Sequence, residues 1–173
     1  MLKKITLVLL MVACGIICKA EEAKNLIQNP NFSKNFKGWF VTHKKAFSVK
    51  DNILSIKGLP EIGEKNSYVK CARTLKLAKE QITSKKFTFG ITVKATKVSG
   101  KLMLAVRESD VKGKTINYQR IMLKKRDKYD WKKFTKTFTA SPKAVHIGIY
   151  IVATHLQGDD DIQVKDMYLN SVE

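Results

Sequence analysis

The chain has 173 residues, 44% of them hydrophobic, so it is long enough for one domain with a substantial core and too short for two of ordinary size. Thirty-three Lys and Arg residues against fifteen Asp and Glu residues give a net charge of +18, which favours a solvated basic surface, with attraction to an acidic polysaccharide or an anionic cell surface as the alternative. The sequence has no recognisable nucleic-acid-binding motif, so we expect no nucleic-acid partner.

Residues 1–20 have the pattern of a secretory signal peptide. Two lysines precede the apolar run Ile5–Cys18, and Cys18-Lys19-Ala20 offers small residues at the positions that a signal peptidase reads. The run is about fourteen residues long, shorter than the roughly twenty that a membrane span needs. Lipoprotein processing at Cys14 is the alternative, and the apolar residues after Cys14 argue against it. We therefore expect an extracytoplasmic protein, secreted or periplasmic, whose mature domain spans residues 21–173.

Removal of residues 1–20 would leave Cys71 as the one cysteine, so an intrachain disulfide is excluded. Cys71 alternates with Val69 and Leu75, which predicts a buried structural thiol. Arg73 interrupts the same apolar parity. A cation in that position must be paired, exposed at a groove, or placed at the margin of a sheet.

The mature chain alternates apolar and polar residues with the two-residue period of half-buried strands. A short strand after Asn25 leads into a turn at Asn29-Pro30-Asn31, and the strands Ala46–Val49 and Ile53–Ile56 flank a hairpin break at Asp51-Asn52. Further strands are expected over 68–77, 87–95, 102–106, 115–123, 131–140, 145–152 and 162–172. The segment 87–95 has the cleanest alternation, so we expect it in the centre of a sheet.

Two expectations concern the C-terminal strands. The turn Ser141-Pro142-Lys143 separates the strands that follow Trp131 and Val145, and a short turn between strands predicts an antiparallel pair. In the last strand, one face is expected to carry Ile162, Val164, Asp166 and Tyr168. Roughly ten short strands without a long helical period predict an all-β protein, a sandwich or a barrel, in one domain.

The order of several motifs resembles the carbohydrate-binding modules of the galactose-binding-like jelly-roll type. These motifs are Asn25–Phe32 followed by Gly38-Trp39, the strand Tyr68–Leu77, Trp131–Phe134 with Thr137–Ala140, and Val164–Leu169. The resemblance covers nearly all of the mature chain. It implies a two-sheet antiparallel β-sandwich, a jelly roll, in which a concave sheet can hold a glycan chain.

The resemblance also bears on a structural calcium ion. Relatives often carry an acidic residue at the position of Ser33, which helps to hold calcium between the first and last strands; here Asp166 remains at the other end. Calcium prefers several oxygen ligands, so the sequence favours no metal and no cofactor. Asp159, Asp160 and Asp161 could substitute, but an acidic surface turn is the simpler interpretation.

A sugar site needs a flat aromatic ring for the apolar face of the pyranose and planar hydrogen-bonding groups for its hydroxyls. Trp39 and Trp131 fall on family positions that belong to the core, so we expect both to be buried. The candidate ligand-binding residues are instead three tyrosines and three arginines on strands: Tyr68, Arg73, Arg107, Tyr118, Arg120 and Tyr150. The alternative is that these are surface side chains without a ligand.

Catalysis is not expected. His43, His146 and His155 lack metal-ligand spacing, and no serine or cysteine lies in a nucleophile motif. The sequence therefore predicts a non-catalytic, monomeric binding domain whose partner is a polysaccharide or oligosaccharide. The alternative is an envelope-associated structural or interaction protein that uses a jelly roll without binding sugar.

Overall fold

The computed structural model describes residues 24–59, 68–123 and 128–172. The predicted signal peptide, with the lipoprotein alternative at Cys14, lies outside these ranges. No helix in them is long and apolar enough to cross a membrane.

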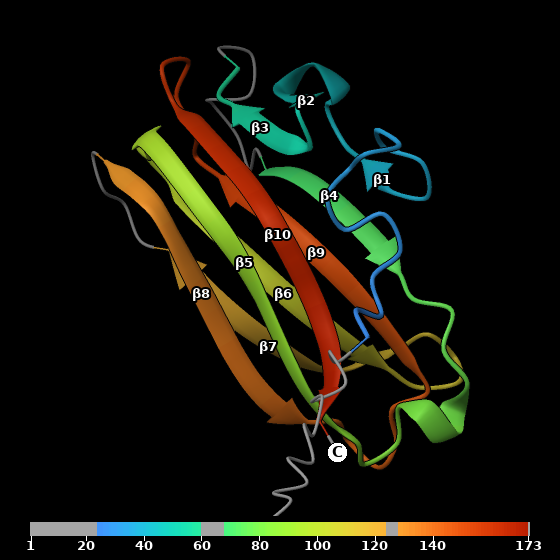
Figure 1. The fold of residues 1–173 in the computed structure, drawn as a ribbon. Helices are drawn as coiled ribbons and strands as arrows, with labels where there is room; N and C mark the ends of the chain where they lie inside the picture. Colours follow the sequence, from blue (N-terminus) through green and yellow to red (C-terminus); the bar gives the residue numbers. More distant parts are fainter. Residues whose placement is uncertain (1–23, 60–67, 124–127, 173) are drawn as a thin grey trace, which may run out of the picture.

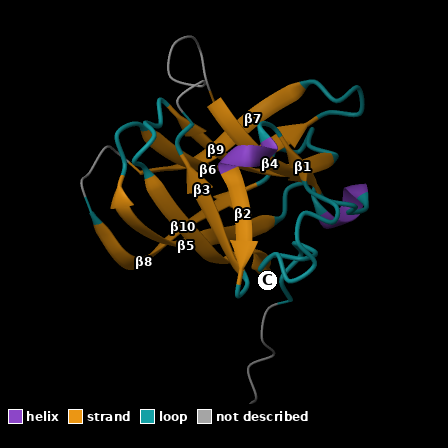
Figure 2. Cartoon of the chain, turned by 90° about the horizontal axis from the view of Figure 1, so that it is seen from above, coloured by secondary structure: helices purple, strands orange, loops and turns teal. Residues whose placement is uncertain are grey.

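The described residues form ten strands in two antiparallel five-stranded sheets (Figure 1). One sheet has the order β1-β4-β9-β6-β7, and the other has the order β2-β3-β10-β5-β8. The bounds are β1 Phe40–Val41, β2 Phe47–Lys50, β3 Ile53–Lys57, β4 Tyr68–Thr74, β5 Lys86–Lys97, β6 Lys101–Ser109, β7 Thr115–Leu123, β8 Tyr129–Thr139, β9 His146–Thr154 and β10 Asp161–Val172. Figure 2 shows the layers from above. The predicted all-β sandwich is confirmed.

The core lies between the sheets and is built by the alternation of the strands. On β5, Phe87, Phe89 and Ile91 point inward and are at most 1% exposed, and they belong to the same core cluster as the inward residues of β9, which include Ile147 and Ile149. Full burial of one such side chain contributes about 1.5–3 kcal/mol. β5 pairs with β10 on one side and with β8 on the other, which confirms its predicted interior place.

The hairpin predicted at Asp51-Asn52 is also confirmed. β2 and β3 pair antiparallel with Lys50 opposite Ile53, so Asp51 and Asn52 form the connection. These two residues have φ of 51° and 61°. Two left-handed residues match the twist of the flanking strands, and Asp and Asn tolerate that conformation better than most residues.

The antiparallel pair predicted across Ser141-Pro142-Lys143 is wrong. β8 pairs with β5, whereas β9 pairs with β4 and β6 in the other sheet. The connection therefore carries the chain from one sheet to the other. Its anchor is Glu108, a buried residue of β6 whose Oε2 accepts a hydrogen bond from the backbone N–H of Ser141 at 2.6 Å.

The prediction of which residues share one face of the last strand is correct only for the first half of the strand. Ile162 and Val164 are buried, but Met167 and Leu169 are buried after them, so the inward parity changes. The change occurs at a register shift between Lys165 and Tyr168, where Asp166 has φ of 49°. An extra residue in a strand flips the following side chains to the other face. Asp166 and Tyr168 consequently leave the core face.

Candidate functional site

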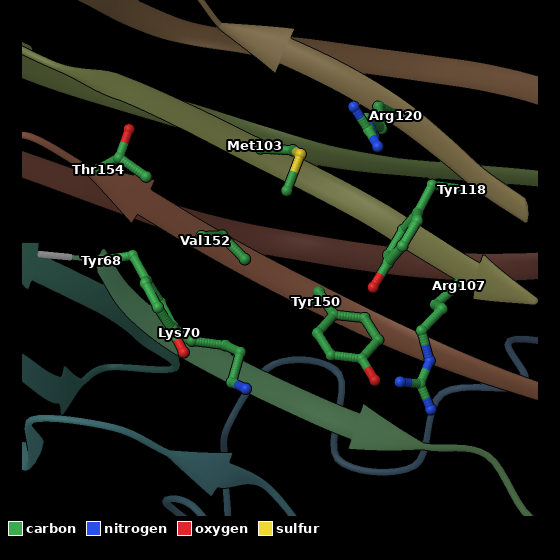
Figure 3. A pocket seen from close by; sticks show the side chains of 9 residues that line it. All are labelled: Tyr68, Lys70, Met103, Arg107, Tyr118, Arg120, Tyr150, Val152 and Thr154. Atoms are coloured by element: carbon green, nitrogen blue, oxygen red, sulfur yellow. The ribbon is translucent and has the colours of Figure 1, made fainter. Parts of the chain in front are cut away.

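The outer face of the sheet β1-β4-β9-β6-β7 has a hollow of about 490 Å³. We call it the groove. Its lining side chains come from four adjacent strands, β4, β9, β6 and β7, and all point away from the core (Figure 3). They are Tyr68, Lys70, Met103, Arg107, Tyr118, Arg120, Tyr150, Val152 and Thr154.

Small residues around Tyr150 leave room for the groove. Ala72 on β4 and Ala105 on β6 lie directly opposite Tyr150 on its two neighbouring strands. Gly148 precedes Tyr150 on the same face of β9, and the ring of Tyr150 lies over it. Alternation along the strands thus places one large ring among three residues with little or no side chain.

One end of the groove is a cluster of rings and guanidinium groups. The rings of Tyr118 and Tyr150 meet edge to face, with 6.4 Å between their centroids. Cζ of Arg107 lies 5.6 Å from the Tyr150 centroid, and Cζ of Arg120 lies 5.2 Å from the Tyr118 centroid. Such cation–π contacts hold the rings and the cations in a defined arrangement.

The electrostatics of this end keep Tyr150 protonated. Burial raises the pKa of the Tyr150 hydroxyl, the nearby Arg107 lowers it, and Tyr118 adds to the rise. The hydroxyl is therefore a donor as well as an acceptor at neutral pH. Nε of Arg107 is buried and has no hydrogen-bond acceptor among the described residues. An unpaired buried donor is costly, and a bound ligand can supply its acceptor.

The other end of the groove holds a second aromatic and cationic cluster. Nζ of Lys70 lies 5.8 Å from the ring centroid of Tyr68 and 5.2 Å from that of Phe40 on β1. Tyr68 is 46% exposed and Phe40 is 62% exposed. Figure 3 shows Val152 and Met103 between this cluster and the Tyr118–Tyr150 end. The same face thus presents large open rings at both ends.

Five of the six candidate residues come together in the groove, namely Tyr68, Arg107, Tyr118, Arg120 and Tyr150. Arg73 does not. Its guanidinium donates to Oε1 of Gln28 at 2.7 Å and to the carbonyl of Lys37 at 3.2 Å, and its Cζ lies 6.0 Å from the Trp39 ring. It borders a separate hollow of about 300 Å³ formed with residues 28–37. Arg73 is thus a hydrogen-bonded cation outside the groove, at the end of β4.

The groove also contains residues that the sequence interpretation did not select: Lys70, Met103, Val152 and Thr154. The alternation of side chains along each strand could have identified these four residues, because each shares a strand face with a selected residue. Lys70 shares the face of Tyr68 on β4, and Val152 and Thr154 share the face of Tyr150 on β9. Met103 likewise shares the face of Arg107 on β6.

The two tryptophans differ in their exposure to solvent. Trp39 is 7% exposed and its Nε1 donates to the carbonyl of Asn29 at 3.2 Å, as expected for a core position. The expectation that Trp131 is buried is wrong, because it is 36% exposed. It lies on the outer face of the edge strand β8, on the parity opposite to the core residues Phe134 and Phe138. Nζ of Lys165 lies 4.4 Å from its ring centroid.

Hydrogen bonds hold the segment around Ser33 together and join Asn25 to the last strand. In the described part of the chain, no three His, Cys, Asp or Glu side chains gather as a metal site. The Asn25 amide joins the first segment to the last strand, since Nδ2 donates to the carbonyl of Met167 and Oδ1 accepts from the N–H of Leu169. The side-chain oxygens of Asn29 and Asn31 accept hydrogen bonds from Ser33.

The acidic turn at residues 159–161 lies only partly at the surface. Asp160 is 1% exposed, and its carboxylate accepts hydrogen bonds from the backbone N–H groups of Ser99 and Gln157 and from the Ser99 hydroxyl. Asp159 does lie at the surface and pairs with Lys97. The hydrogen bond from Lys97 lowers the pKa of the Asp159 carboxyl. Asp160 therefore orders the turn between β9 and β10.

Comparison with known proteins relates this fold to solved structures. No family model and no curated protein matches the sequence. A solved CBM4 structure is similar over 84% of this chain and 99% of that chain, with a TM-score of 0.61 and 16% identity. A Family 16 Carbohydrate Binding Module-2 is similar over 86% and 100%, with a TM-score of 0.58 and 18% identity.

A third similar structure is TmCBM61 in complex with β-1,4-galactotriose, with a TM-score of 0.55, 17% identity, and coverage of 87% of this chain and 100% of that chain. All three likenesses span nearly the whole length of the solved modules, so they concern the complete sandwich. Identities below 20% establish the architecture and not the ligand. The described chain has the jelly-roll fold of carbohydrate-binding modules, as the resemblance of its motifs implied.

Proposed function

We propose that residues 21–173 form an exported, monomeric and non-catalytic domain that binds a polysaccharide or oligosaccharide in the groove. Tyr68, Tyr118 and Tyr150 would supply ring faces, and Arg107 and Arg120 would donate hydrogen bonds to the sugar. The solved modules of the same fold, one of them in complex with β-1,4-galactotriose, support this assignment. The leader-like pattern of residues 1–20 supports export.

The observation that carries the proposal is the setting of Tyr150. Its ring lies over Gly148 between two alanines, so small neighbours leave space around a flat aromatic surface. Tyr118 and Arg107 flank this ring, and Nε of Arg107 has no acceptor among the described residues. A pyranose has an apolar face that stacks on such a ring and equatorial hydroxyls that accept from planar donors.

The composition of the groove supports a non-catalytic role. Glycoside hydrolysis generally uses two carboxyl groups on either side of the scissile bond. None of the nine lining residues carries a carboxyl group. The lining is suited to hold a sugar chain and provides no acid or base of the kind that this reaction uses.

Affinity electrophoresis in gels that contain neutral or acidic polysaccharides tests the proposal. The wild-type protein should be retarded by at least one polymer, and Tyr150→Ala and Tyr118→Ala should each weaken retention about tenfold, which corresponds to about 1.4 kcal/mol. The matched control is Tyr168→Ala, because Tyr168 also lies over a glycine, Gly90, but on the outer face of the other sheet. Thermal unfolding of each variant verifies that it is folded.

Two results would contradict the proposal. Equal loss of retention in Tyr168→Ala and Tyr150→Ala would show that the groove is not the site. A lack of retardation by every polymer, together with salt-sensitive binding to anionic vesicles, would favour the envelope-associated interaction protein.

A further inference from the structure

The groove carries positive charge without compensating negative charge. Lys70, Arg107 and Arg120 are among its lining residues, and no Asp or Glu is. Figure 3 shows Lys70 near Tyr68 at one end, and Arg107 and Arg120 near Tyr118 at the other. The cations stand on three different strands, β4, β6 and β7, so the charge extends across the sheet.

These cations differ from others in the molecule in what they contact. Arg73 donates to a side-chain oxygen and a carbonyl, and Lys97 pairs with Asp159. By contrast, none of the groove cations forms an ion pair or a side-chain hydrogen bond within the described ranges, and their recorded contacts are with the rings of Tyr68, Phe40, Tyr118 and Tyr150. Each guanidinium has five N–H donors in a planar fork that fits carboxylate and sulfate oxygens.

Among the three groove cations, Arg107 gives the strongest argument for an anionic ligand, because its Nε is buried and lacks an acceptor among the described residues. A neutral sugar laid over it would remove water from the guanidinium and return only hydroxyl acceptors. An anionic group would compensate the partly buried positive charge, and charge-assisted hydrogen bonds are roughly twice as strong as neutral ones. The ring contacts do not neutralise the cation, because a tyrosine ring carries no net charge.

We infer that the ligand of the groove is an acidic polysaccharide, with carboxylate or sulfate groups on its sugars. This inference rests on the proposed function, that the groove binds a glycan. Lys70 lies opposite Val152 of β9 and Arg107 lies opposite Gly148, so the two backbones are separated by two strand spacings and by four residues along the strand, roughly 16 Å in all, at opposite ends of the groove. One anionic group cannot reach both, and a polymer with repeated charges can. The tyrosine rings contact the uncharged faces of its sugars.

Pairs of polymers that share a backbone and differ in charge provide the test. Sodium polygalacturonate and its methyl-esterified form differ in free carboxylates, and dextran sulfate and dextran differ in sulfates. Titration calorimetry or affinity electrophoresis gives the affinity of the wild-type protein for each. We expect at least a tenfold preference for the charged member of at least one pair, and the pair that shows it identifies carboxylate or sulfate as the recognised group.

The variant Arg107→Gln/Arg120→Gln tests whether the preference belongs to the groove. It should reduce the charged-to-neutral affinity ratio to within about twofold of unity, because the charged polymer loses more affinity than the neutral one. The control, Lys50→Gln/Lys86→Gln, removes two charges from exposed positions on the other sheet and should keep the preference. This control separates a specific site from the general attraction of a basic protein for polyanions.

The outcomes separate this inference from the proposed function. Equal binding of charged and neutral polymers, lost in Tyr150→Ala, would overturn the inference and leave the proposed function intact. A preference lost equally in both double variants would also overturn the inference, because net charge would explain it. Failure of every polymer to bind would overturn both.

Discussion

The ring of Tyr150 lies over Gly148, two residues earlier on the same face of β9. A methyl group on Gly148 would come within 2.8 Å of Cε2 and 3.2 Å of the hydroxyl oxygen of Tyr150. The absence of a side chain at Gly148 therefore decides where the Tyr150 ring can lie. Glycine weakens a strand interior, so its presence here is explained by this close approach.

Gly148→Ala is predicted to weaken glycan binding without unfolding the domain. The added methyl group meets the end of a flexible side chain, so the ring can move away and the strand stays intact. We expect a five- to tenfold loss of affinity for the polymer that wild type binds, and a free energy of unfolding within about 1 kcal/mol of wild type, since Ala removes the entropic cost of Gly. Calorimetric titration and thermal unfolding measure the two quantities.

A double-mutant cycle identifies the cause. In a Tyr150→Ala background, Gly148→Ala should have no further effect on affinity, because the ring that it displaces is gone. Additive losses would show that Gly148 acts on the ligand directly and not through Tyr150.

The groove could be predicted in large part from the sequence, because alternation determines which face a residue occupies. Tyr68, Arg107 and Tyr150 lie on strands whose inward residues are clearly apolar, so their outward direction follows directly. The alternation is weaker around Tyr118, because Gln119 shares the inward parity with Ile121 and Leu123. That these strands are neighbours in one sheet follows from the resemblance to jelly rolls and not from alternation.

The errors have separate physical causes, and the first is that pairing between distant strands is not encoded locally. The turn at Ser141-Pro142-Lys143 looks the same whether the chain continues in one sheet or crosses to the other, and here it crosses. The family position of Trp131 predicts burial, although its own parity relative to Phe134 places it on the outer face. The bulge at Asp166 depends on a single left-handed residue that alternation cannot show.

Arg73→Ala is predicted to leave groove affinity within about twofold of wild type. Its guanidinium packs against Gly38 and Trp39 and binds Gln28, outside the groove. Removing it should lower the free energy of unfolding by about 1 kcal/mol, through two lost hydrogen bonds at a partly exposed site. Arg107→Ala is the matched comparison. It should lower groove affinity and change the free energy of unfolding little. A tenfold loss of affinity in Arg73→Ala would extend the site to the neighbouring hollow.

Glu108→Ala is predicted to destabilise the domain by about 1–3 kcal/mol, measured by urea unfolding. Glu108 is fully buried, and its loss would leave the N–H of Ser141 without an acceptor at the crossing between the sheets. Glu108→Gln keeps an oxygen acceptor and should cost less than Glu108→Ala. Equal destabilisation by the two variants would show that the hydrogen bond to Ser141 is not what anchors the connection.

The thiol of Cys71 links stability to alkaline pH. Cys71 is fully buried in β4, and burial raises its pKa from 9.0 to about 12. Between these values the unfolded chain loses the thiol proton while the folded chain keeps it. The unfolded state then binds fewer protons, so the free energy of unfolding falls as pH rises.

We therefore predict that the contribution of Cys71 is complete below about pH 9 and declines by roughly 1.4 kcal/mol per pH unit between about 9 and 12. Lysine side chains also lose charge in this range, so the measurement needs a variant that keeps them all. Cys71→Ala does so, and it should be less stable than wild type at pH 8 because it leaves a small cavity. Urea unfolding at intervals from about pH 8 to about pH 11 should show the difference between the two proteins shrinking and then reversing, since the alanine side chain has no proton to lose. A constant difference over this range would mean that the thiolate is tolerated inside the sandwich.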